Sequence, residues 1–170
     1  LGCGEGRLLL DLIDWGASRE AISAIELREE AVESAREKVP GIDIVCGSAT
    51  EMPWPDGHFD IVFVSTVFSS ILDDHMRRKL VGEIHRVLSG NGVVVWYDFF
   101  LDNPANPDVK GLRKKDVENL FCEFDVQLKR LTLAPPVSKR IPRRLSKVTI
   151  PLLSLFPFLK THYLGIIRKK

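Results

Sequence analysis

Two spacings of apolar residues alternate along the first hundred positions of the chain. Short apolar runs repeatedly give way to segments in which apolar residues recur every three or four positions, the first spacing being typical of buried strands and the second of helices. The predicted helices are 7–14, 28–39 and 73–88, and the predicted strands are 21–26, 42–46, 59–65 and 93–97. Strands that alternate with helices favour a mostly parallel sheet with helices on both faces. We therefore expect an α/β, doubly wound, Rossmann-like fold.

The last seventy residues extend the pattern. A helix is predicted around 114–121, followed by strands at 125–133 and 161–168. The last strand is expected to pair antiparallel with 125–133 at the sheet edge. Gly90-Asn91-Gly92 is expected to end the helix before strand 93–97, because glycine and asparagine commonly terminate helices. The whole chain, 1–170, then forms one domain.

The chain opens on the glycine-rich stretch Leu1–Arg7, which leads directly into the first predicted helix. Glycines let the backbone adopt positive φ and let a ligand approach the main chain, and the first turn of a helix offers free N–H groups. This combination predicts a nucleotide-type cofactor loop. The apolar strand that should precede such a loop is not in the sequence, so we expect the first strand of the sheet to be largely missing.

Composition places the chain among ordinary globular proteins. Of its 170 residues, 45% are hydrophobic and 28% are charged, enough for a real core. Its three cysteines are widely separated and form no CxxC pattern, which argues against a disulfide framework and a zinc site. We expect no metal and a cytoplasmic setting. No apolar run reaches the roughly 20 residues of a membrane-spanning helix.

Charge is unevenly distributed although the net charge is only +1. Residues 1–109 carry 9 basic and 19 acidic side chains, whereas 110–170 carry 15 basic and 4 acidic ones. Part of the basic excess lies in a basic and apolar insertion, 134–160, between the last two predicted strands. Its 137–160 portion is either a solvated basic helix followed by a core-packed segment or a lid that touches a membrane surface or a lipid-linked substrate. Nucleic acid is not expected, because no interleaved aromatic residues accompany the basic ones.

Several ordered motifs within roughly residues 1–100 resemble the class I S-adenosylmethionine-dependent methyltransferases, in particular the bacterial type 11 group. They are Gly2-x-Gly4-x-Gly6, Glu26, Gly47-Ser48-Ala49, Met52-Pro53-Trp54-Pro55-Asp56-Gly57-x-Phe59-Asp60, and Glu83-Ile84-x-Arg86-Val87-Leu88. The resemblance implies S-adenosylmethionine as cofactor. A dinucleotide loop, G-x-G-x-x-G, would place a glycine where this chain has Arg7. The spacing therefore favours S-adenosylmethionine over NAD.

The resemblance also implies which residues hold the cofactor. Glu26, at a strand end, is expected to accept the ribose hydroxyls. Ser48 stands where the family commonly has an aspartate that binds the adenine amino group, so adenine binding is expected to be weaker. The full predicted cofactor set is Gly2, Cys3, Gly4, Gly6, Glu26, Leu27, Ser48, Ala49, Thr50, Met52, Ser65 and Thr66.

The acceptor is expected at the carboxyl ends of the later strands, where open α/β sheets bind ligands. Its predicted contacts are Phe68, Tyr97, Asp98 and His162. Methyl transfer from a sulfonium needs alignment and exclusion of water more than it needs a base. For a hydroxyl acceptor a base would help, and Asp98 and His75 are the candidates.

The sequence thus predicts a methyltransferase that O-methylates a small or lipid-linked acceptor, such as a glycan or a secondary metabolite. One alternative is a quinone or lipid methyltransferase at the membrane surface, which would make the protein membrane-associated. Another is an NAD(P)-binding Rossmann oxidoreductase, or a cofactor-binding protein without catalysis.

Overall fold

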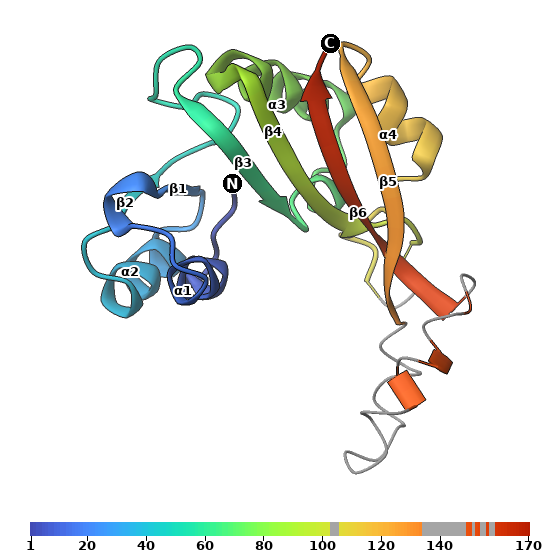
Figure 1. The fold of residues 1–170 in the computed structure, drawn as a ribbon, viewed down its shortest axis with the longest axis horizontal. Coiled ribbons are helices and arrows are strands. Elements are labelled where there is room, and N and C mark those ends of the chain that lie inside the picture. The colour runs from blue at the N-terminus through green and yellow to red at the C-terminus, as the bar shows by residue number, and fades with distance from the viewer. Residues whose placement is uncertain (103–105, 134–148, 151, 154–155, 157–158) are drawn as a thin grey trace.

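The computed structural model describes residues 1–102, 106–133, 149–150, 152–153, 156 and 159–170. Its strands form two sheets (Figure 1). The smaller sheet pairs β1 (Ser23–Glu26) with β2 (Asp43–Cys46). The larger one has the order β3-β4-β6-β5, with β3 (Phe59–Ser65), β4 (Leu88–Phe99), β5 (Phe124–Leu133) and β6 (Lys160–Lys169).

Strand directions agree with the expected fold class. β1 is parallel to β2 and β3 is parallel to β4. β6 is antiparallel to both of its neighbours, β4 and β5. The predicted Rossmann-like α/β fold with an antiparallel last strand is confirmed, and β6 lies between β4 and β5.

The glycine-rich stretch enters between the two sheets. The amide of Gly2 donates to the carbonyl of Ile25 on β1 at 2.9 Å. The nitrogen of Leu1 donates to the carbonyl of Phe63 on β3 at 2.6 Å. No strand in the described parts of the chain lies between β1 and β3; Leu1 and Gly2 connect them by hydrogen bonds, and Ile25 packs in the same buried cluster as Val62 and Val64.

Two helices accompany the smaller sheet. α1 (Arg7–Asp14) and α2 (Glu29–Lys38) contribute Leu9, Val32 and Ala35 to a buried cluster that also contains residues of β1 and β2. Gly6 allows close packing here, because a Cβ on it would lie 3.3 Å from Ala35.

The other helices, α3 (Asp74–Val87) and α4 (Lys114–Leu120), lie on one face of the larger sheet (Figure 1). The main core forms there, with Leu80, Ile84, Val94, Trp96 and Phe121 at most 1% exposed. α3 begins where the sequence predicts, because the Asp73 side chain accepts a hydrogen bond from the Met76 amide at 2.8 Å and so caps the helix.

Arg86, near the end of α3, fastens the loop between β2 and β3. Its guanidinium donates to the carbonyls of Trp54 at 2.7 Å and Met52 at 2.9 Å. It also pairs with Glu83, whose carboxylate accepts from the Met52 amide at 2.8 Å. The hydrogen bond from Arg86 lowers the pKa of Glu83. The loop is therefore held mainly through its backbone.

One expectation about an element boundary is wrong. Gly90-Asn91-Gly92 does not end α3, which stops at Val87; these residues lie inside β4. Leu88 already has an extended backbone (φ −77°, ψ 132°). A Cβ on Gly92 would come within 2.7 Å of the Leu88 side chain and 3.1 Å of the Phe59 carbonyl. Glycine thus permits close packing within the strand.

Short 3₁₀ turns also adjust the predicted boundaries. Because η1 (Arg19–Ala21) precedes it, β1 begins at Ser23 and not at residue 21 as predicted. A second such turn, η2 (Phe68–Ser70), follows β3. Within the described residues, no helix combines the length and the apolar character that crossing a membrane requires.

The core predicts a large and position-dependent cost of truncation. Ile84→Ala should lower the free energy of unfolding by about 2–5 kcal/mol, because Ile84 is 0% exposed and its removal leaves a cavity. Met76→Ala, on the same helix but 46% exposed, should change it by less than about 0.5 kcal/mol. Urea denaturation of both variants measures the difference, and equal losses would contradict the described orientation of α3.

Candidate functional site

β1 and β2 end at one edge of the smaller sheet, and β3 and β4 end at one edge of the larger sheet. Gly2 lies against both regions, since it is bonded to Ile25 and packs against Val67, and the loops there carry most of the predicted site residues. Strands with parallel directions bring their carboxyl ends to the same edge, which is where open α/β sheets bind ligands. β1 ends at Glu26, β3 at Ser65 and β4 at Phe99.

Glu26 is bound to the glycine loop. Its carboxylate accepts hydrogen bonds from the Gly4 amide at 2.9 Å and the Arg28 amide at 3.1 Å. The Arg28 side chain, which is 71% exposed, adds a contact at 3.3 Å. Gly2, Gly4 and Gly6 all have positive φ, between 52° and 84°, a conformation that glycine adopts readily. The glycines therefore bend the loop so that an amide faces the carboxylate.

Glu26 is also held in its charged form. Its side chain is mostly buried, and burial alone raises the pKa. The hydrogen bonds from the Arg28 and Gly4 amides and from the Arg28 side chain outweigh burial and lower the pKa of Glu26 below its ordinary value. The carboxylate remains an acceptor at neutral pH.

Space remains above the loop for a ligand. A Cβ placed on Gly4 would meet no atom within 4 Å, whereas one on Gly2 would lie 2.7 Å from the Val67 side chain. The carboxylate oxygen that accepts from Gly4 has a second lone-pair direction, and the exposed Arg28 side chain can move away. An open backbone beside a fixed carboxylate fits a ribose-bearing cofactor, since carboxylates accept hydrogen bonds from vicinal hydroxyls.

The loop after β2 lies beside the end of β1, because the Gly47 amide donates to the Glu26 carbonyl at 2.9 Å. Within it, the hydroxyls of Ser48 and Thr50 are hydrogen-bonded to each other at 2.8 Å. Met52 is buried in the main core, and both its backbone groups are already bonded to α3. The adenine contacts assigned to this loop stay predictions.

The predicted cofactor residues that remain differ in exposure. Ala49 and Ser65 are half-buried, and Leu27 is 72% exposed. The thiol of Cys3 lies 3.6 Å from the Gly4 carbonyl. Thr66 has a positive φ of 54°, and its amide donates to the Tyr97 carbonyl at 2.8 Å. Thr66 is thus held next to Tyr97 of the neighbouring strand, while the Cys3 thiol contacts the adjoining residue Gly4.

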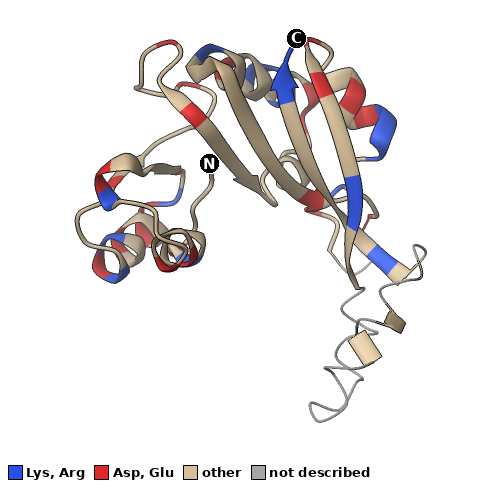
Figure 2. Cartoon of the chain, in the orientation of Figure 1, with Lys and Arg blue, Asp and Glu red and all other residues tan. Residues whose placement is uncertain are grey.

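Asp98 is the one acidic residue of β4 and lies near its carboxyl end (Figure 2). It is 0% exposed, and its two oxygens accept from the amides of Ser69 at 3.1 Å and Phe99 at 2.8 Å. Burial raises the pKa of Asp98, while hydrogen bonds from Ser69 and Phe99 oppose the rise. Its catalytic role stays a prediction.

Tyr97 and His162 stack on each other from adjacent strands, with ring centroids 4.7 Å apart and planes 6° apart. The Tyr97 hydroxyl is hydrogen-bonded to the Thr132 hydroxyl at 2.6 Å. The ring centroid of Phe99 lies 4.0 Å from that of His162. Burial lowers the pKa of His162. Tyr97, Phe99 and His162 therefore form a cluster of three aromatic side chains near the carboxyl end of β4.

Two predicted residues lie apart from these contacts. His75 is exposed on the first turn of α3, and within the described residues no hydrogen bond, ion pair or ring contact joins it to Glu26, Asp98 or the glycine loop. Phe68 is 0% exposed and packs on Phe121, with ring centroids 5.6 Å apart. Their predicted roles as base and acceptor contact stay predictions.

Sequence reasoning missed Arg77, which is only 4% exposed although it is charged. Helical spacing could have predicted that Arg77 is buried, since it lies three residues before Leu80 and seven before Ile84, on the buried face of α3.

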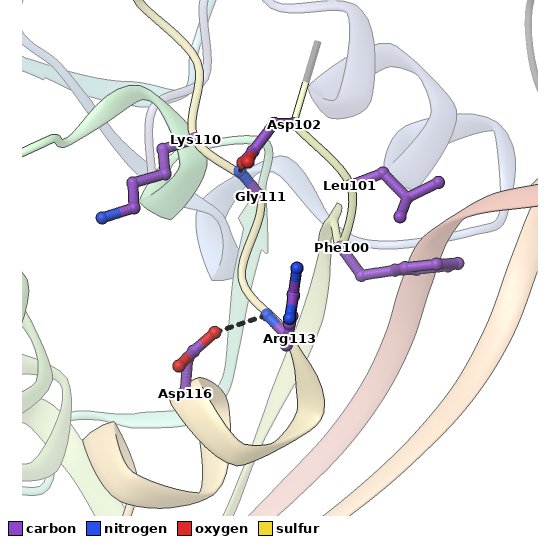
Figure 3. Close-up of a pocket in the computed structure, with 7 residues that line it drawn as sticks. All are labelled: Phe100, Leu101, Asp102, Lys110, Gly111, Arg113 and Asp116. Atoms are coloured by element: carbon purple, nitrogen blue, oxygen red, sulfur yellow. Dashed lines mark hydrogen bonds between the residues drawn. The ribbon is translucent and has the colours of Figure 1, made fainter.

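Sequence reasoning also missed a pocket of about 510 Å³ beyond the end of β4 (Figure 3). Figure 3 shows Arg113 and Asp116 at the start of α4, where the Arg113 amide donates to the Asp116 carboxylate at 2.8 Å. Gly111 closes the pocket against the backbone of Leu101, since a Cβ there would lie 2.6 Å from it. The pocket is lined by Phe100, Leu101, Asp102, Lys110, Gly111, Arg113 and Asp116.

Curated relatives match between 62% and 65% of the chain. A probable S-adenosylmethionine-dependent methyltransferase of Mycobacterium tuberculosis is 30% identical over 113 residues, which are 62% of this chain and 39% of that protein. A ubiquinone/menaquinone biosynthesis C-methyltransferase of Geobacter is 30% identical over 64% of this chain and 47% of its own. A sterol 4-C-methyltransferase of Caenorhabditis elegans is 29% identical over 65% and 33%. The chain spans between a third and a half of the length of these relatives.

Solved structures share the fold at low sequence identity. A SAM-dependent methyltransferase from Archaeoglobus fulgidus superposes with a TM-score of 0.71 at 17% identity, covering 99% of this chain and 83% of that one. The [4+2]-cyclase SpnF does so with a TM-score of 0.68, also at 17% identity, over 99% and 73%. The fold alone therefore does not define the reaction.

The sequence itself defines the family. The model of the family described as "Methyltransferase domain" matches residues 1–96, more than half of the chain, and these residues contain the glycine loop, Glu26 and the Arg86 network. S-adenosylmethionine is the cofactor that membership implies. The chain belongs to this methyltransferase family, the class I S-adenosylmethionine-dependent methyltransferases.

Proposed function

We propose that this chain binds S-adenosylmethionine at the glycine loop and transfers its methyl group to a small or lipid-linked acceptor, with oxygen as the acceptor atom. The observation that carries the proposal is the Glu26 carboxylate, held in its charged form against Gly4 with open space above that glycine. The family match over residues 1–96 supports it.

In this proposal Glu26 accepts the ribose hydroxyls and the glycine loop lies along the amino-acid portion of the cofactor. Ser48, Ala49 and Thr50 lie beside the adenine. The hydroxyl pair of Ser48 and Thr50 would have to reorient to bind an amino group. Because a hydroxyl replaces the charged acceptor that the family commonly has, adenine contributes less affinity than ribose.

The chain's own contribution to the reaction is alignment. S-adenosylmethionine supplies, when bound, an electrophilic methyl group on a sulfonium. Ser65 and Thr66, at the end of β3, would line the methionine portion of the cofactor, and Tyr97, near the end of β4, would orient the acceptor towards the methyl group. Thr66 and Tyr97 are joined by a backbone hydrogen bond. Tyr97 and His162 form an aromatic wall that excludes water. Asp98 and His75 remain candidates for a base.

A second candidate is methylation at carbon on a quinone or another lipid. The observation in its favour is that two relatives carry names of this kind, a ubiquinone/menaquinone C-methyltransferase and a sterol C-methyltransferase. The aromatic wall of Tyr97, Phe99 and His162 is compatible with a flat apolar acceptor. NMR of the methylated product distinguishes methyl on oxygen from methyl on carbon, because the two isomers have the same mass but different methyl chemical shifts.

Peripheral membrane contact through 137–160 belongs to the same second candidate. Most of that segment lies outside the described residues, so the contact stays a prediction. Co-sedimentation with vesicles that contain or lack anionic lipid tests it.

Gly4→Ala should weaken binding of S-adenosylhomocysteine at least about 10-fold, because the new methyl group occupies the space above the loop. Gly16→Ala is the matched control: Gly16 also has positive φ (96°) and open surroundings. Both variants should lose about 1–2 kcal/mol of stability from backbone strain, but only Gly4→Ala should lose affinity. Calorimetry measures both, and binding of NADH in place of S-adenosylhomocysteine would reject the proposed function.

Glu26→Gln should lower the affinity for S-adenosylhomocysteine by roughly 10-fold, because a charged acceptor is lost. The exposed Glu30→Gln on α2 is the control and should bind as the wild type does.

Because the folded-state pKa of Glu26 is lowered, the contribution of Glu26 to stability is present above about pH 4.3, the unfolded value. That contribution is lost as pH falls through the folded pKa. Urea denaturation should therefore show the gap between wild type and Glu26→Gln closing in acid; a constant gap would contradict this.

A further inference from the structure

Three separate parts of the chain form hydrogen bonds to the turn η2 (Phe68–Ser70). The side chain of Arg77, on α3, donates to the Phe68 carbonyl at 3.2 Å. The carboxylate of Asp98, on β4, accepts from the Ser69 amide at 3.1 Å. The Lys110 amide donates to the Ser69 carbonyl at 2.9 Å. Phe68 and Ser69 are at most 1% exposed, so these contacts are shielded from water.

Two of these three contacts come from ionisable side chains that are almost completely buried. Asp98 is 0% exposed and Arg77 is 4% exposed. No ion pair joins them within the described residues; Arg77 pairs instead with Asp74, whose side chain is 65% exposed, at 3.1 Å. One guanidinium nitrogen of Arg77, Nη2, has no hydrogen-bond partner in the described structure. Burying an ionisable or polar side chain is costly unless hydrogen bonds compensate for it. Both Asp98 and Arg77 obtain part of that compensation from the backbone of η2.

The turn is connected to the cofactor loop through the residue before it. A Cβ on Gly2 would lie 2.7 Å from a methyl carbon of Val67, so Val67 sits directly against the glycine loop. Thr66, one residue earlier, has a positive φ of 54° and is tied to the Tyr97 carbonyl. A displacement of η2 therefore moves Val67 relative to Gly2, or increases the strain at Thr66.

We propose that Asp98 and Arg77 are positioning residues that fix η2 and, through Val67, set the glycine loop for cofactor binding. Asp98 acts through the Ser69 amide in this arrangement, and its carboxylate needs no contact with the acceptor. The part that concerns cofactor binding rests on the proposed function; the part that concerns the turn does not.

Amide hydrogen exchange and calorimetry with S-adenosylhomocysteine test the proposal on wild type and Asp98→Asn. An asparagine has a single oxygen for the two amides, so amides in 66–70 should exchange roughly 10- to 100-fold faster. Affinity for S-adenosylhomocysteine should fall at least about 5-fold. The control is Asp60→Asn, which removes an exposed carboxylate from β3 that accepts from Ser89; it should change neither quantity.

Arg77→Met loosens the same turn from α3, so it should speed exchange in 66–70 as well. Its effect on affinity should not add to that of Asp98→Asn in the double variant, because both act through one element. If Asp98→Asn does not fold, Arg77→Lys takes its place, since lysine keeps the charge but lacks the guanidinium fork.

Exchange in 66–70 that is no faster in Asp98→Asn than in Asp60→Asn overturns the proposal. Faster exchange with unchanged affinity rejects the link through Val67. Additive losses in the double variant reject a shared route. Failure of the wild type to bind S-adenosylhomocysteine would instead reject the proposed function, while the exchange rates would still decide whether Asp98 and Arg77 hold the turn.

Discussion

The hydrogen bond between the Gly4 amide and the Glu26 carboxylate is the constraint on which the site depends. It joins the end of β1 to a loop that would otherwise be free to adopt many conformations, because glycine pays the largest entropy cost on ordering. The bond is possible only because positive φ at Gly2, Gly4 and Gly6 turns the amide towards the strand. Since Gly2 is also bonded to Ile25, the loop is held at two points of one strand.

The sequence predicted the elements whose apolar spacing is regular. α3 and β3 follow the predicted spacing, and β5 and β6 pair antiparallel as expected. The start of β4 was missed because glycines at 90 and 92 have two uses, ending a helix and permitting close packing, and only the neighbouring Leu88 and Phe59 decide between them. Local sequence does not contain that contact.

The residues of the site could be predicted where the local sequence determines their position, and could not where distant segments cover them. Glu26 beside the glycine loop follows from its place at a strand end, whereas the burial of Asp98 and Phe68 depends on α3, α4 and the segment around Lys110 closing over them. Exposure at a strand end cannot be read from spacing when distant segments cover it. Arg77 shows the opposite case. Its helical spacing predicts a buried position, whereas its charge suggests an exposed one, and in the structure it is buried.

The pairing of Leu133 with Lys160 closes the hairpin formed by β5 and β6 at the edge where the aromatic wall lies. The two ends of residues 134–159 are thereby fixed next to each other, whatever lies between them. Lengthening a connection between fixed ends costs little free energy, and the cost grows only logarithmically. That connection can therefore be exchanged during evolution without disturbing the register of the sheet or the distant Glu26.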